Sequence, residues 1–360
     1  MEFTVANDQF IDVDIIDTYK SIIWTDRYNE HGDFEICVAM TEKTLDTFQN
    51  GYYMKSDISD HVMIIEDLSL QASTENGSFL IITGRSLESI LSRRIIWVQT
   101  VIPKNTSVDN AIKTLVTDAI INPDIPERAI SNFIYEDSTD SNVTSLKLDG
   151  DIQFTGDNLY DAIKKICDMF ELGFKITLNS SNQFVFKIYS GVDRSYRQEA
   201  LPYVEFSQNF DNLINSDYKL VTSVYKNVTL VAGEGEGIER KTVSINSDAY
   251  SGMQRRELYT DARDLSTKVD DGELTPEQYE EVLINRGLAK LTETGVESNF
   301  DAEVDHLQPY IYGRDYDMGD VVQFQNQFGL AYAVRVMESI YSESESGIEQ
   351  YPTFKILEED

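Results

Sequence analysis

The chain carries one pattern of apolar β segments twice, once near each end. The first copy has its segments at residues 34–38, 51–54, 62–68 and 79–82, and the second at residues 300–304, 319–322, 334–340 and 354–356. In the third segment, Ile64, Glu66 and Leu68 align with Val336, Glu338 and Ile340. Short segments of this kind predict strands of a half-buried sheet. The duplication therefore predicts two similar small β-barrels in one subunit, an architecture typical of ring-forming structural proteins and not of enzymes.

Glu66 and Glu338 are acidic residues on strand faces that are otherwise apolar. One explanation is a β-bulge, because an extra residue in a strand turns the acid outward. The other is an acid at the boundary between two barrels, paired with an Arg or Lys of a neighbouring unit. The sequence leaves both explanations open.

The segment that follows Glu66 predicts one strand of a hairpin. Leu68, Leu70 and Ala72 alternate with polar residues, which is the pattern of a half-buried strand. The dipeptide Asn76-Gly77 then predicts the hairpin turn, because both residues tolerate positive φ.

Residues 93–200 predict a compact α+β domain with two helices and a hairpin. Ser107 lies in a capping-box variant before a helix with apolar residues at helical spacing. A second helix follows Gly156, and Gly173 ends it. Two strands then form the predicted hairpin, at residues 174–178 and 184–189.

Residues 201–360 return to β segments, which one strong helix interrupts. Thr275, Pro276 and Gln278 supply its N-cap, first-turn proline and capping-box partner. We expect a helical insertion at about 252–298 in the second barrel. The fold class expected is α+β and mostly β, with domains at residues 1–92 (first barrel), 93–200 (α+β domain) and 201–360 (second barrel with the insertion).

The chain has 360 residues and a formal charge of −33. Specific nucleic-acid binding is not expected, because neutralising phosphates needs clustered Lys and Arg. An acidic surface near DNA repels the polymer and lets it slide past, although acidity also serves solubility alone. The N-terminus shows no signal peptide, and no apolar run is long enough to cross a bilayer. We therefore expect a soluble chain made in a cytoplasm.

No residues form a recognisable catalytic, cofactor-binding or metal-binding motif. The glycine-rich segment Gly233–Gly237 lacks the G-x-G-x-x-G spacing, and its two Glu would repel a phosphate, so a hairpin tip is expected. The histidines and cysteines show no ligand spacing, and the chain holds only His31, His61, His306, Cys37 and Cys167. The sequence predicts no catalytic residue, no cofactor and no metal.

Five longer stretches occur in one order along the chain: 83–97 (TGRSLESILSRRIIW), 155–159 (TGDNL), 191–195 (GVDRS), 225–237 (YKNVTLVAGEGEG) and 255–263 (RRELYTDAR). Together they resemble a family of long-tailed siphophage tail proteins from phages and prophages of Gram-positive bacteria. This family is related in fold to the baseplate hub of contractile phages and to the amino-terminal hub part of tail-associated lysins. The resemblance covers nearly the whole chain.

The resemblance implies a homotrimer, in which three subunits with two barrels each make a ring of six units. Such a ring would join the six-fold tail tube and the distal tail protein hexamer to the tip. Its implied partners include the C-terminus of the tape-measure protein and receptor-binding or fibre proteins. The implied function is a structural hub in the virion tail tip that gates DNA passage through its lumen, with no specific nucleic-acid binding and no membrane-spanning segment.

Two other functions stay open at this point. The first is a cell-wall-degrading tail-associated enzyme, which would need two placed carboxylates among the 63 acidic residues. We expect no enzyme, because the chain ends at Asp360, just after the second barrel, where tail-associated lysins continue into hydrolase domains. The second is a carbohydrate-binding adhesin, whose groove would use exposed aromatic residues such as some of the 20 Tyr.

Overall fold

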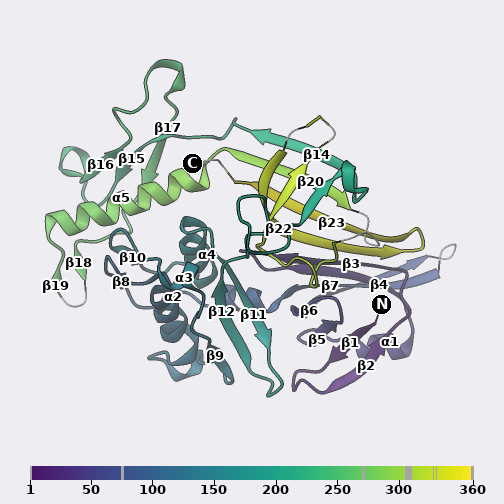
Figure 1. Cartoon of the computed structure of the whole chain (residues 1–360). Helices are drawn as coiled ribbons and strands as arrows, with labels where there is room; N and C mark the ends of the chain where they lie inside the picture. Colours follow the sequence, from purple (N-terminus) through teal and green to yellow (C-terminus); the bar gives the residue numbers. More distant parts are fainter. Residues whose placement is uncertain are drawn as a thin grey trace.

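The computed structural model describes residues 2–73, 77–269, 272–304, 310–326, 328–329 and 331–357. The chain is mostly β, with its helices concentrated in the middle part and in one insertion (Figure 1). Within the described part, one sheet of thirteen strands contains strands from both ends of the chain. This sheet is made of two modules, one near each end of the chain.

The first module lies near the N-terminus. Its elements are β1 Phe3–Ala6, β2 Asp12–Ile16, β3 Ser21–Arg27, β4 Asp33–Ala39, α1 Glu42–Thr47, β5 Tyr53–Ser56, β6 Val62–Ser73 and β7 Gly77–Ser86. Neighbouring strands follow the order β3, β4, β7, β6, β5, and all these pairs are antiparallel. Alternate residues of the strands point into one core that contains Trp24, Phe34, Met54 and Ile65.

The second module lies near the C-terminus. Its strands are β13 Glu205–Ser207, β14 Leu213–Val221, β20 Glu297–Val304, β21 Val321–Gln325, β22 Ala331–Ser344 and β23 Gly347–Ile356. The antiparallel order is β14, β20, β23, β22, β21, which repeats the order of the first module strand for strand. Its core contains Phe300, Val322, Val336 and Phe354.

Backbone hydrogen bonds at matching positions relate the two modules in detail. The amide of Gly51 donates to the carbonyl of Ile65 at 2.8 Å, and the amide of Gly319 donates to the carbonyl of Val336 at 2.9 Å. Both glycines have positive φ, at 85° and 87°. Glycine adopts this conformation without steric cost, so both copies keep it at the same turn. The predicted correspondence of Gly51 with Gly319 therefore holds.

The predicted alignment of the third segment is wrong by one residue. Ile65, and not Ile64, occupies the position of Val336, because each lies just before a β-bulge. The bulges fall between Ile65 and Asp67 in β6 and between Val336 and Glu338 in β22. Hence Asp67, and not Glu66, corresponds to Glu338.

The fourth segment is also shifted from the sequence alignment. Phe34 lies opposite Gly84, and Phe300 lies opposite Phe354. Phe354 therefore corresponds to Gly84 and not to Phe79. A Cβ atom at residue 84 would lie 2.8 Å from the ring of Phe34, so the first copy needs glycine where the second holds an aromatic residue.

The middle part between the modules is α+β, with the two predicted helices and the predicted hairpin. Ser107 caps the first helix by accepting from the amide of Asn110, and β11 pairs antiparallel with β12. Val62 and Ile64 belong to the core of this middle part, so β6 is buried on both faces near its start. The elements are β8 Thr100–Ile102, α2 Val108–Val116, β9 Phe133–Tyr135, α3 Ser141–Thr144, β10 Ile152–Phe154, α4 Leu159–Met169, β11 Gly173–Leu178 and β12 Phe184–Tyr189.

An insertion separates β14 from β20, although Val221 of β14 pairs directly with Glu297 of β20. It comprises β15 Val228–Ala232, β16 Thr242–Ile245, β17 Glu257–Asp261, β18 Lys268–Val269, β19 Gly272–Glu273 and α5 Pro276–Glu293. The predicted capping box of Thr275 and Gln278 begins α5. The predicted start of the insertion near residue 252 is wrong: β15 pairs with β16 and β17, so these strands belong to the insertion and not to the second module.

Candidate assembly interface

The two modules are joined by strand pairing between β22 and β3. The register is antiparallel and runs from Glu338 opposite Arg27 to Ser344 opposite Ser21. The second half of β22 thus stays paired with β23 on one edge, while its other edge passes from β21 to β3 of the first module (Figure 1). We call this pairing the seam. Trp24, of which 1% is exposed, lies opposite Tyr341 at the seam, and Tyr341 packs against the core of the first module.

An ion pair between Arg27 and Glu338 joins the two modules across the seam, beside the bulge of β22. Nε of Arg27 donates to Oε1 of Glu338 at 2.7 Å, and Nη1 of Arg27 donates to the carbonyl of His31 at 3.0 Å. Arg27 also binds Asp33 on the neighbouring strand. Both predicted explanations of Glu338 therefore apply, because a bulge lies directly before it and its partner comes from the other module.

Glu66 has a different environment from Glu338. It is the extra residue of the bulge in β6, and it binds Arg85 of the neighbouring strand through two hydrogen bonds of 2.6 and 2.8 Å. These hydrogen bonds hold the pKa of Glu66 below its usual value. The partner of Glu66 therefore lies in its own module, unlike the partner of Glu338.

Tyr28 joins three parts of the chain at the end of β3. Its amide donates to the carbonyl of Met337, and its hydroxyl donates to the carbonyl of Glu171 at 3.0 Å. Its ring lies so close to Gly173 and Gly319 that a Cβ atom at either position would overlap it. Tyr28 therefore fixes the seam against both the second module and the middle part.

The seam uses one edge of each module and leaves the other edge open. In the described residues, β14 pairs only with β20, and β6 pairs only with β7 beyond Ile65. Both edges carry exposed apolar side chains: Leu68 (41%), Leu70 (61%), Tyr218 (43%) and Leu220 (53%). The half-buried face predicted for Leu68 and Leu70 is therefore wrong for the single chain. Open strand edges with apolar side chains are templates for pairing with another chain.

A buried ion pair ties the first module to the middle part. Nδ1 of His61 lies 3.4 Å from Oε1 of Glu88, and this carboxylate oxygen accepts the amide of Ile176 at 2.7 Å. The imidazole is in charge contact with Glu88 and not hydrogen-bonded to it. Burial lowers the pKa of His61, but the charges of Asp26 and Glu88 outweigh burial and raise that pKa to about 9.

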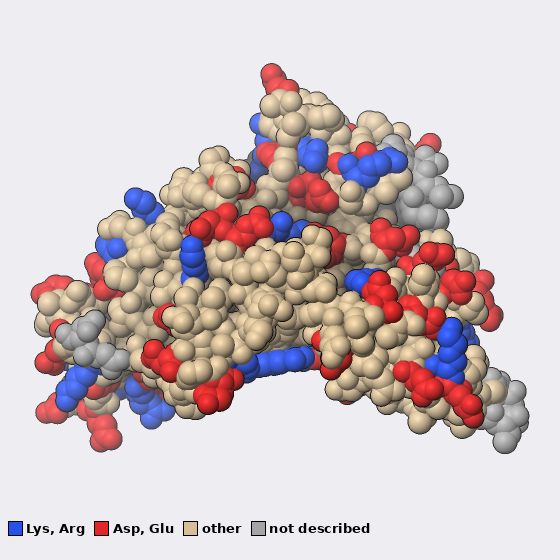
Figure 2. Space-filling view, turned by 90° about the horizontal axis from the view of Figure 1, so that it is seen from below, with Lys and Arg blue, Asp and Glu red and all other residues tan. Residues whose placement is uncertain are grey.

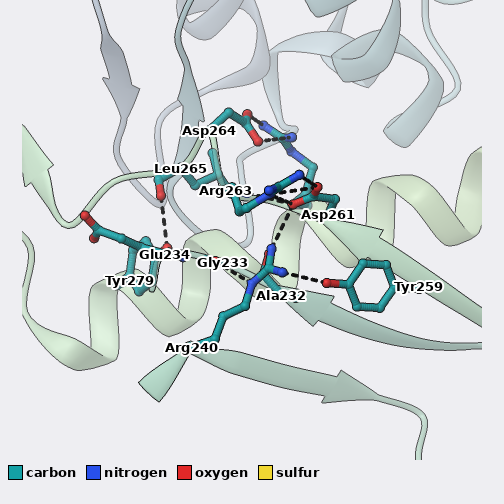
Figure 3. A network of polar contacts seen from close by, with 11 residues as sticks. Ala232, Gly233, Glu234, Arg240, Tyr259, Asp261, Arg263, Asp264, Leu265 and Tyr279 are labelled. Atoms are coloured by element: carbon teal, nitrogen blue, oxygen red, sulfur yellow. Dashed lines mark hydrogen bonds and ion pairs between the residues drawn. The ribbon is translucent and has the colours of Figure 1, made fainter. Parts of the chain in front are cut away.

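The glycine-rich segment connects β15 to β16, so it is the predicted hairpin connection (Figure 3). Arg240 returns to this segment and donates to the carbonyls of Gly233 (3.0 Å) and Ala232 (2.9 Å). The amide of Glu234 donates to the hydroxyl of Tyr279 on α5 at 2.7 Å. The amides of Gly233 and Glu234 are thus used for internal hydrogen bonds and do not point to a phosphate.

The remaining candidate side chains are not assembled into a reactive site. The hydroxyl of Tyr160 accepts the amide of His31, Cys37 lies in β4, and Cys167 is buried on α4, where burial raises the pKa of its thiol. His306 lies outside the described residues. Among the residues that the structure describes, no group of His, Cys, Asp or Glu is placed to hold a metal ion.

On the face shown in Figure 2, charged side chains are spread without one dominant patch. Asp and Glu side chains gather there in small groups, at the edges and in the upper middle of the face, interspersed with Lys and Arg. The excess of acid gives −33 for the whole chain. None of the helices described here has the length and apolar character needed to span a membrane.

Comparison with protein families decides the classification. The model of the Siphovirus ReqiPepy6 Gp37-like protein family matches residues 2–354, nearly the whole chain. The chain belongs to this family. The predicted resemblance to siphophage proteins is thereby confirmed. A search of curated protein sequences found no match.

Solved structures with the fold of this Gp37-like chain include three tail proteins. A prophage MuSo2 43 kDa tail protein from Shewanella oneidensis is 11% identical, with a TM-score of 0.59 and 98% of each chain covered. A tail protein from Neisseria meningitidis is 13% identical, with a TM-score of 0.56 and coverage of 98% and 96%. Prophage tail protein gp18 from Listeria monocytogenes is 14% identical, with a TM-score of 0.54 and coverage of 100% and 96%. At these identities the likeness concerns the fold.

Two features of the interface escaped the sequence reasoning. Arg27 and Tyr28 were not singled out, because a residue at a strand end gives no periodic signal of its contacts. The open edge of β14 was also missed, since 75 or so residues separate this strand from β20 and hide their pairing. A signal was present in the alternation of Tyr218 and Leu220, which matches that of Leu68 and Leu70.

Proposed function

We propose that this chain is the structural hub at the distal end of a phage tail, where it forms a homotrimeric ring. Its family is a siphovirus family, and the three proteins of the same fold are described as tail proteins. In this proposal the two modules are small barrels, the first within residues 1–92 and the second within residues 201–360. The protein acts by assembly and not by catalysis.

The observation that carries the proposal is the head-to-tail joining of two equivalent modules. At the seam, the first module contributes β3 and the second contributes β22. These two strands hold different positions in the repeated strand order, so the seam joins two different surfaces of the module. A contact between two different surfaces repeats until it closes into a ring or grows into a filament. Three chains with two modules each give six near-equivalent units, which suits a junction between a three-fold tip and a six-fold tube.

The proposed partners follow from that position in the virion tail tip. The ring would bind the distal tail protein hexamer on one side, receptor-binding or fibre proteins on the other, and the C-terminus of the tape-measure protein inside. DNA passes through the lumen without specific contacts, because a chain with a charge of −33 does not favour adhesion of phosphates. Gating requires the subunits to rotate or separate on host binding.

Gold-labelled antibody against the chain, bound to intact particles, tests the location in the virion. We expect label at the distal end of the tail, and label along the tube or at the head would overturn the proposal. Light scattering of the purified protein tests the assembly. The expected mass is about three times the 41.0 kDa of one chain.

A further inference from the structure

We propose that neighbouring chains join through the open edges of β6 and β14, in the same strand register that the seam uses inside one chain. This inference rests on the proposed ring and specifies its interface. The occupant of each open edge is a second copy of this chain. The register is obtained by transferring the seam, residue by residue, through the equivalence of the two modules.

The equivalence of β6 with β22 follows from the bulges. Because Ile65 corresponds to Val336, Leu68 corresponds to Ser339 and Leu70 corresponds to Tyr341. The open part of β6 is therefore the counterpart of the half of β22 that crosses the seam.

The equivalence of β14 with β3 follows from their partner strands. Trp24 lies opposite Phe34, and Tyr218 lies opposite Phe300, the residue that corresponds to Phe34. Tyr218 therefore corresponds to Trp24, and Leu220 corresponds to Asp26. The open edge of β14 is the counterpart of the edge of β3 that β22 covers.

The transferred register brings the exposed apolar residues together. Inside the chain, Ser339 lies opposite Asp26 and Tyr341 lies opposite Trp24. Between chains, the same register places Leu68 opposite Leu220 and Leu70 opposite Tyr218, because these residues correspond to Ser339, Asp26, Tyr341 and Trp24. The four side chains thus form two apolar cross-strand pairs on one face of the joined sheet.

Burial at the seam supports this assignment. The counterparts Trp24, Asp26 and Ser339 are 1%, 2% and 4% exposed, and Tyr341 packs against the core of the first module. The equivalent positions at the open edges are from 41% to 61% exposed and are all apolar. A second copy on these edges would bury them as the seam buries their counterparts.

The polar residues between these pairs are compatible with the same register. Ser69 lies opposite Lys219, and Asp67 lies one diagonal step from Lys219. No pair of like charges is placed directly opposite between Asp67 and Gln71, whose partners are Val221 and Asp217. A register shifted by one residue would turn the apolar residues of one strand to the other face.

Cysteine cross-linking tests the register in the full-length protein with Cys37 replaced by Ser. The variant L68C/L220C is expected to form disulfide-linked chains under mild oxidation, in a ladder that ends at three chains. The matched control L68C/I214C moves the second cysteine six residues along β14, about 20 Å away. Ile214 is 51% exposed, close to the value for Leu220, and this control is expected to stay uncross-linked.

The outcomes separate the register from the ring itself. A trimeric mass with equal cross-linking of both variants, or with none, overturns the register and leaves the proposed hub intact. Cross-linking of L68C alone or L220C alone would show each edge pairing with itself and overturns the proposal. A monomeric mass with no cross-link overturns both the register and the ring.

Discussion

Arg27 of the first module and Glu338 of the second are bound across the seam, with 2.7 Å between Nε and Oε1. Their side chains are 24% and 22% exposed, so the pair is partly shielded from water. It lies next to the bulge that both modules share, at the point where one edge of β22 passes from β21 to β3. The ion pair therefore links the two copies of the module directly, at the first residue pair of the seam.

We expect Arg27 and Glu338 to be coupled energetically. R27M should lower the free energy of unfolding by about 1–2 kcal/mol, because it leaves the carboxylates of Glu338 and Asp33 without their cation. E338Q should lower it by about 1 kcal/mol, because Arg27 keeps its ion pair with Asp33. In a double-mutant cycle measured by urea denaturation, the coupling should be about 1 kcal/mol. Additive effects of the two substitutions would show that the pair contributes nothing to the seam.

The equivalent glycines provide a matched comparison. In G51A the new Cβ meets nothing within 4 Å, whereas in G319A it would lie 2.2 Å from Cε2 of Tyr28. Both substitutions carry the cost of positive φ, about 1 kcal/mol. G319A should lose about 2 kcal/mol more in denaturant unfolding, because the ring of Tyr28 is held between the second module and the middle part. Equal losses would mean that Tyr28 moves freely.

The His61–Glu88 pair predicts a dependence of stability on pH. The pKa of His61 is about 9 in the folded chain against 6.5 in the unfolded reference, so its stabilisation is complete below pH 6.5 and is lost as the pH rises to 9. The change is on the order of 3 kcal/mol. The measurement is the unfolding free energy of the wild type minus that of H61Q at both pH values.

This difference removes the contribution of groups common to both proteins, such as Lys165, whose pKa burial lowers to about 8. It should shrink between pH 6.5 and 9. A difference that stays constant over this range would show that His61 is neutral in the folded chain. The pair also loses stabilisation at acid pH. Burial raises the pKa of Glu88, but the charge of His61 outweighs burial and lowers that pKa, so the contribution of Glu88 is lost as the pH falls through its folded-state pKa.

Arg240 and Arg263 both bind Asp261 but differ in their other contacts. Arg240 also donates to two backbone carbonyls of the glycine-rich connection, and its side chain is 19% exposed against 68% for Arg263. R240M should therefore raise amide hydrogen exchange in the insertion by about tenfold or more, since about 2 kcal/mol of local stability is lost. R263M should change exchange less than about twofold. Similar effects of both would contradict this assignment.

The sequence predicted the repetition but not its register. Gly51 and Gly319 were matched correctly, because glycine at a turn is visible in the sequence. Ile64 was matched with Val336 in place of Ile65, since the periods of both strands change at a bulge and the bulged residue differs: Glu66 in one copy and Met337 in the other. A bulge shifts the alternation of inward and outward side chains by one residue, and no particular residue type marks its position in the sequence.

The insertion shows why strand patterns alone do not assign a strand to a sheet. The segments of β15 and β16 have the apolar residues expected of strands of the second module, but β15 pairs with β16 on one side and with β17 on the other. Helix α5 was predictable to the residue at its start, because the capping box of Thr275 and Gln278 is a local signal. Long-range pairing, such as that of β14 with β20, has no such local signal.

End-on electron microscopy of the purified assembly tests the central claim most directly. If each chain contributes two equivalent modules joined as at the seam, averages along the axis will show three-fold symmetry with six densities at one radius. Modules at two clearly different radii, or a particle without three-fold symmetry, would contradict the account.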